Sequence, residues 1–280
     1  MRLGVMFDRD LPPEQLIPFA RALDGESAVD DLWVVEDLGW TGGISAAATA
    51  LAVTSRLRVG IGITPAPLRN PMLLAMELAN LARVHPGRLA AGIGHGVQDW
   101  MRQVGAAAPS PLALLEETIT SVRALLRGET VTLDGKSVRL EGVSLVHPPT
   151  EPPPVLAGVK GPRSLALSGR VAQGTIVPEG VGPAQVPEIL AQIGGDAEHE
   201  LVVFTYLHTG AGAAEATADM VAGQAEFLGI RPDEVVMAAG TPAEAAAQVK
   251  AFWAAGAHTV ALRPLGADPL RHVHAILSAM

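Results

Sequence analysis

The stretch RVGIGITPAPLRNPMLLAMELANLARVHPGRLAAGIGHG, residues 58–96, contains one complete strand–helix–strand unit. Two short apolar runs, at residues 57–63 and 88–94, enclose a longer segment in which leucines recur with helical spacing. Asn70 supplies an N-cap for that helix, and Pro71 lacks the N–H that a first helical turn leaves unbonded. The two runs do not alternate with polar residues, which is typical of parallel strands covered on both faces.

The chain repeats this unit about eight times, and the repetition favours parallel strands separated by helices over a β-sandwich. The length of 280 residues would also allow two smaller domains. A single α/β barrel of about 250 residues fits the repeat best. We therefore predict a (β/α)8 TIM barrel over residues 1–280. Its strands are expected at residues 3–7, 32–35, 57–63, 88–94, 155–158, 175–177, 201–207 and 259–263.

The segment VTLDGKSVRLEGVSL, residues 131–145, departs from the repeat because its apolar and polar residues alternate. Asp134 and Gly135 at its centre are the signal of a two-residue type I′ turn. We therefore predict a β-hairpin inserted into the barrel at about residues 130–146.

The composition excludes several classes of function. The net charge is -9, so the chain lacks the basic field that nucleic-acid binding needs, and we expect no nucleic-acid partner. It has no cysteine, and no spacing of histidines and acids suggests a metal site. No apolar run approaches the ~20 residues of a membrane span or forms a signal segment. We expect a cytoplasmic protein without membrane contact.

The segment GVKGPRS, residues 158–164, is a glycine-rich turn that leads from a strand into a helix beginning near Pro162. Such a turn directs backbone N–H groups and a helix N-terminus at one point, which suits a phosphate or another anion. Lys160 and Arg163 would add positive charge and Ser164 a hydroxyl. The alternative is an ordinary tight turn.

Polar residues also follow two other strands, at the barrel end where catalytic groups gather. Glu36 and Asp37 could serve as a base or cofactor partner, although an acid there is also often a helix cap. His95 lies between glycines in GIGHG, residues 92–96, and could shuttle a proton or be structural. The glycines themselves either let a flat ring approach the backbone or relieve crowding inside the barrel.

Residues 58–101 and the stretch VLAGVKGPRSLALSGRVAQGTIV, residues 155–177, resemble the bacterial-luciferase-like superfamily. The resemblance is strongest to the branch that uses coenzyme F420, which includes methylene-tetrahydromethanopterin reductases and glucose-6-phosphate dehydrogenases. It implies a (β/α)8 barrel that holds a deazaflavin or a flavin and exchanges hydride at its ring.

The resemblance also implies roles for individual residues. A cis non-proline peptide in a bulge of the third strand would fall near Ile61-Gly62, and the cofactor phosphate would bind the glycine-rich turn. The catalytic candidates are His95, Glu36 and Asp37, of which His95 would face the ring with one of the two acids. The cofactor-binding candidates are Ile61, Gly62, Thr64, Gly158, Lys160, Gly161, Pro162, Arg163 and Ser164.

The chain departs from this branch where the sugar-phosphate dehydrogenases carry Asp-His and a further acid, since it has Glu36-Asp37 and Val97. A sugar-phosphate substrate is therefore doubtful. We predict an oxidoreductase that transfers a hydride between F420 and a small organic substrate. An FMN-dependent monooxygenase is the alternative, followed by a non-redox enzyme for a phosphorylated metabolite and a non-catalytic flavin-binding relative.

The resemblance further implies a homodimer that pairs through the early barrel helices. The alanine-rich stretch AAATALA, residues 46–52, would otherwise expose small apolar side chains. The alternative is that other helices of the same chain cover it.

Overall fold

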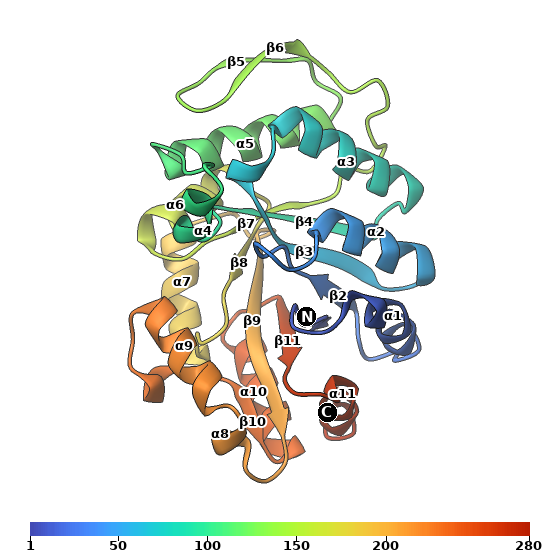
Figure 1. The fold of residues 1–280 in the computed structure, drawn as a ribbon, viewed down its shortest axis with the longest axis vertical. Helices are drawn as coiled ribbons and strands as arrows, with labels where there is room; N and C mark the ends of the chain where they lie inside the picture. The colour runs from blue at the N-terminus through green and yellow to red at the C-terminus, as the bar shows by residue number, and fades with distance from the viewer.

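Eight parallel strands form a closed barrel in the computed structural model, which describes all 280 residues (Figure 1). Each strand pairs with the next along the ring, and the pairing of β8 with β9 closes it. The predicted TIM barrel and its eight strands are confirmed. In ring order the strands are β1 (Arg2–Met6), β2 (Asp31–Val34), β3 (Arg58–Pro65), β4 (Leu89–Gly94), β7 (Val155–Gly158), β8 (Gly174–Val177), β9 (Glu200–Thr209) and β11 (Thr259–Pro264).

Helices surround the barrel and occupy its loops. No helix has the length and apolar character needed to cross a membrane. The helices are α1 (Leu16–Asp24), α2 (Gly43–Val53), α3 (Pro71–Val84), α4 (Gln98–Gln103), α5 (Pro111–Leu126), α6 (Pro162–Val171), α7 (Val186–Ile193), α8 (Ala213–Ala216), α9 (Ala218–Leu228), α10 (Pro242–Ala254) and α11 (Pro269–Leu277). The Asn70 side chain caps α3 as predicted, because its Oδ1 accepts a 2.9 Å bond from the N–H of Met72.

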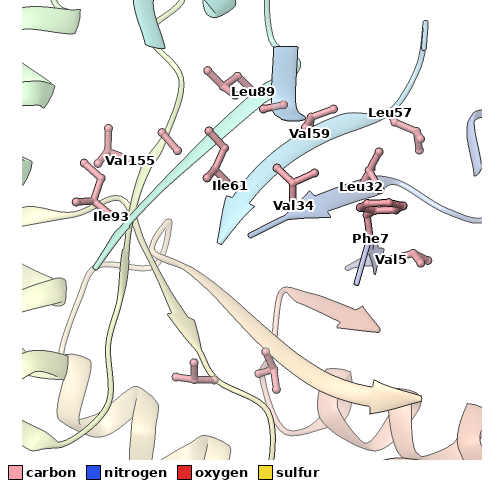
Figure 2. Packing of buried hydrophobic residues seen from close by; sticks show 14 of the residues in the cluster. Val5, Phe7, Leu32, Val34, Leu57, Val59, Ile61, Leu89, Ile93 and Val155 are labelled. Carbon is pink, nitrogen blue, oxygen red and sulfur yellow. The ribbon is translucent and has the colours of Figure 1, made fainter. Parts of the chain in front are cut away.

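The main hydrophobic core of 54 buried residues lies between the outward faces of the strands and the helices. Figure 2 shows this face on β1 to β4 and β7, where alternate residues such as Val5, Leu32 and Val59 project from neighbouring strands. The core forms because successive side chains of a strand point to opposite faces, and both faces here are apolar.

A second, smaller cluster fills the barrel interior around Trp33, whose ring lies 5.3 Å from that of Phe204. Glycines make room for these side chains. A Cβ at Gly60 would lie 2.3 Å from Trp33, and one at Gly92 would lie 2.3 Å from the carbonyl oxygen of Ile61. Gly92 therefore relieves crowding inside the barrel.

Strand β3 contains the irregularity that the resemblance implied. Its register against β4 shifts between Ile61 and Thr64, and the Gly62–Ile63 peptide bond is cis, one bond beyond the expected position.

The inserted hairpin consists of β5 (Val131–Asp134) and β6 (Arg139–Val143), but its turn differs from the expected type. Asp134 pairs with Arg139, so the connection is the four residues 135–138, and neither Asp134 nor Gly135 has a positive φ. The Glu117 carboxylate of α5 accepts hydrogen bonds of 2.8–2.9 Å from the N–H groups of residues 136–138. The Glu117 carboxylate thus binds the tip of the loop, and a 2.9 Å bond from the N–H of Gly135 to the carbonyl of Val138 closes the loop at its base.

A buried ion-pair network, hereafter the basal network, occupies the N-terminal end of the barrel. Nη2 of Arg58 lies 2.6 Å from Oδ2 of Asp31 and 2.7 Å from Oε1 of Glu200. Burial alone would raise the pKa of Glu200, but the hydrogen bond and charge of Arg58 outweigh it and lower the pKa to about 2. The network thus holds two carboxylates on one guanidinium.

The alanine-rich stretch of α2 is not the exposed face that the sequence suggested. Ala46, Ala47 and Ala50 are buried within the chain itself, as the alternative interpretation held. Exposed apolar side chains lie instead on α3, at Leu73, Met76 and Val84.

Candidate active site

The C-terminal ends of the eight barrel strands and the loops that follow them form the mouth of the barrel. In barrels of this kind the loops at this end carry the chemistry, while the opposite end serves stability. The predicted site residues come from β2, β3, β4 and β7 and the loops after them, and the fold brings all of them except Ile61 toward the mouth.

The turn at residues 158–164 ends in α6, which begins at Pro162 as predicted. Gly161 is its N-cap with φ +82°, and a Cβ added there would meet nothing within 4 Å. The backbone N–H groups of Lys160, Gly161, Arg163 and Ser164 donate to no other backbone group of the protein. Four free donors at an open helix N-terminus are the arrangement that binds a phosphate or another anion.

The two basic side chains of this turn behave differently. The Lys160 side chain extends toward α9, where its Nζ donates a 2.5 Å bond to the backbone carbonyl of Phe227. The same Nζ lies 3.9 Å from the centre of the Phe227 ring. Burial lowers the pKa of Lys160. Arg163 is exposed and forms no ion pair, so its guanidinium is free to approach a ligand at the turn.

His95 lies beside this turn. Its Nε2 is 3.1 Å from Oγ of Ser164, and its Nδ1 is buried without a direct hydrogen bond. Burial lowers the pKa of His95, an effect that the Pro111 carbonyl partly offsets. Burial therefore favours the neutral form of the His95 imidazole, and the contact with Ser164 joins it to the turn at residues 158–164.

The Glu36 carboxylate has both a charged and a backbone partner in the structure. Both of its oxygens bind Arg69, and Oε2 also accepts a 2.7 Å bond from the N–H of Gly43 at the start of α2. Glu36 is thus an ion-paired helix cap, the second of the two roles that an acid at a strand end can take.

Asp37 is likewise engaged, with its Oδ2 2.5 Å from Nη1 of Arg9. The Arg9 guanidinium also stacks 4.5 Å from the centre of the Trp40 ring, and Trp40 lies 5.9 Å from Trp100 of α4. Asp37 therefore holds Arg9, and through it the Trp40 ring, in place at the edge of the mouth.

The three candidates from β3 divide between the two faces of the strand. Ile61 packs outward into the main core, as Figure 2 shows, and does not reach the mouth. Gly62 faces inward, where an added Cβ would lie 2.4 Å from Phe204. Thr64 is buried beside Ile93 of β4.

The sequence analysis assigned no role to a group of buried charges at the ends of β1, β8 and β11. Nε of Arg263 in β11 lies 2.6 Å from Oδ2 of Asp8, and its Nη1 lies 3.4 Å from Oε1 of Glu179. Arg263 also lies 5.4 Å from the centre of the Tyr206 ring, whose hydroxyl donates to Gln224. Asp8 and Glu179 follow strands and Arg263 lies near the end of one, a signal that marks their positions but not their pairing.

The residues at the turn fit the phosphate-bearing cofactors that the family resemblance implies. The four free N–H groups of the turn offer donors for phosphate oxygens, and Arg163 and Lys160 supply positive charge nearby. No group of three or more histidines and acids could hold a metal ion.

Comparison with known proteins gives a consistent set of relatives. A family model described as "Luciferase-like monooxygenase" matches residues 4–271. A 5,10-methylenetetrahydromethanopterin reductase of Methanolobus tindarius is 26% identical over 63% of this chain and 54% of its own length. An F420-dependent glucose-6-phosphate dehydrogenase of Beutenbergia cavernae is 30% identical over 68% of this chain and 60% of its own length. The matches thus span little more than half of these curated relatives.

Solved structures share the fold over nearly the whole chain. A coenzyme F420-dependent tetrahydromethanopterin reductase from Methanopyrus kandleri superposes with a TM-score of 0.84 at 18% identity, covering 98% of this chain and 96% of its own. A monooxygenase from Streptomyces bottropensis gives a TM-score of 0.82 at 20% identity, covering 100% and 98%. At these identities the likeness shows the architecture alone.

Proposed function

Since the chain belongs to the luciferase-like monooxygenase family, we propose that it is an oxidoreductase that transfers a hydride between F420 and a small organic substrate. The observation that carries this proposal is the open turn at residues 158–164, with free N–H donors next to His95 and Ser164. The curated glucose-6-phosphate dehydrogenases that are named as F420-dependent support this cofactor over FMN.

The residues of the turn would hold the cofactor phosphate. The N–H groups of Gly161 and Arg163 would donate to it, and the Ser164 hydroxyl, bonded to His95, would be fixed in direction. F420 supplies the hydride-carrying ring, and the protein's part is to orient that ring and exclude water. Glu36 and Asp37 act through their ion pairs, because these fix the loops around the mouth.

Titration of the purified protein with F420 and with FMN tests the proposal. We expect saturable binding of F420, followed by fluorescence, that is tighter than binding of FMN. Tighter FMN binding would favour the monooxygenase alternative, which the Streptomyces bottropensis structure supports at the level of the fold. Failure to bind either cofactor would leave a non-redox enzyme or a non-catalytic relative as the better hypothesis.

Reversing the charge of Lys160 should weaken cofactor binding. Lys160→Glu removes a cation from the turn and places an anion beside the phosphate, which should raise the Kd for F420 by about tenfold or more. The matched control is Arg170→Glu at the other end of α6, which changes the net charge equally. An unchanged Kd in Lys160→Glu would exclude this lysine from the site.

The protein should also form a homodimer through α3. Its exposed Leu73, Met76 and Val84 lie next to a groove of about 310 Å³ between α2 and α3, lined in part by Ile44 and Leu81. Burying such side chains against a second copy would remove an exposed apolar surface from water. We expect a dimeric mass by light scattering and a monomeric one for Met76→Arg, whereas a monomeric parent protein would contradict the proposal. The cytoplasmic location stays a prediction.

A further inference from the structure

Acidic side chains dominate the part of the mouth that lies outside the turn at residues 158–164, in the loops after β1, β2 and β8. We define this acidic half by Asp8, Asp10, Asp37 and Glu179 with their partners Arg9 and Arg263. We infer that the acidic half admits uncharged substrates with a flat apolar body and rejects phosphorylated and carboxylated ones. The inference rests on the proposed function, because it assumes that the cofactor occupies the turn.

The first argument is the balance of charge. Four carboxylates face only two guanidinium groups, and each guanidinium is already paired. Arg263 is the more buried of the two, since its side chain is 12% exposed and lies between Asp8 and Glu179. An anionic substrate would find no free cation here and would be repelled by the surplus of negative charge.

The second argument is that positive and negative charges occupy different parts of the mouth. Lys160 and Arg163 belong to the turn, and Arg163 has no acidic partner. An anion that enters the mouth would therefore bind at the turn, where the cofactor phosphate is proposed to lie. With the turn filled, the remaining space favours a ligand without negative charge.

The third argument concerns shape. The Trp40 side chain is 44% exposed although its ring is fixed by Arg9 below it and by a 2.9 Å bond from Nε1 to Asp10. Trp100 of α4 extends this surface. A flat indole held in place at the edge of the mouth suits stacking with an aromatic or alicyclic compound.

A pair of probes that differ by one carboxylate tests the inference. Equilibrium dialysis of F420-loaded protein with 2-acetylnaphthalene and with 6-acetyl-2-naphthoate should show tighter binding of the uncharged ketone, by about tenfold or more. Equal affinity for the two, tighter binding of the naphthoate, or binding of neither would overturn the inference.

Failure of the proposed function would be seen separately, as an absence of F420 binding. In that case the same probe pair is measured with excess inorganic phosphate filling the turn, and the expected preference is the same. A preserved preference would then support the acidic half while the cofactor proposal fails.

Variants assign the preference to the acidic half. Asp8→Asn with Glu179→Gln removes two of the three acids around Arg263 and leaves only the exposed Asp10, 3.9 Å away. It should bring the affinity for the naphthoate to within a few-fold of that for the ketone. The control Asp134→Asn with Glu129→Gln removes two exposed charges that are not part of the acidic half and should keep the preference. If thermal melting shows that the first variant is unfolded, Asp37→Asn should shift the preference in the same direction, and an unshifted preference there would contradict the assignment.

Discussion

Replacing Arg58 by methionine should lower the free energy of unfolding by about 3–5 kcal/mol, because the substitution leaves two buried carboxylates without their partner. Asp31 has no exposed side-chain surface and Glu200 only 14%, so water cannot solvate them in the variant. Methionine keeps most of the volume, which limits the contribution of a cavity. Urea unfolding at neutral pH measures the change.

The pH dependence of this effect gives an internal check. In the parent protein the lowered pKa of Glu200 contributes stability above its ordinary value of 4.5, and this contribution is lost as the pH falls toward about 2. Arg58→Met lacks it at every pH, so the two proteins should converge in acid. Adding Glu200→Gln to the variant should restore part of the stability. A decrease in the free energy of unfolding of less than about 1 kcal/mol for Arg58→Met would show that the basal network is not stabilising.

Replacing His95 by alanine should raise the Kd for F420 by about 10- to 100-fold, the cost of a lost hydrogen bond in a charged site. The reason is the contact of Nε2 with Ser164, which places His95 at the turn. At saturating F420 the single-turnover rate should stay within a few-fold of the parent rate, and His95→Gln should recover part of the affinity.

A variant that keeps its affinity for F420 but loses rate would assign a different role to His95. If His95→Ala binds F420 normally but loses about 10²–10⁴-fold in single-turnover rate, the imidazole acts in proton transfer at the ring. That outcome would restore the role first suggested by its position after β4. A melting temperature lowered without either change would make His95 a structural histidine.

The fold could be predicted well because apolar runs and helix signals are local features. The eight strands and the cap at Asn70 depend on residues a few positions apart. The short strand β10 (Ala238–Gly240) was missed, since three small residues carry no apolar pattern. The hairpin turn was predicted wrongly because Glu117, a residue of α5, determines its shape.

The site was less predictable because its pairings link distant parts of the chain. Whether Glu36 caps a helix or faces a ligand depends on Arg69, which lies in the loop that follows β3. The contact between Asp8 and Arg263 joins residues 255 positions apart, so no local pattern reveals it. The sequence indicates which residues reach the mouth, but not which of them neutralise one another.

The ring closure of the barrel has a consequence for the order in which the protein can fold. Strand β1 has only two neighbours, β2 and β11, and Arg2 pairs with Thr259. During synthesis one edge of β1 stays without its partner until the last barrel strand has left the ribosome. The nascent chain must therefore keep an apolar strand edge from pairing with other chains for most of its translation, which makes it a natural client for chaperones.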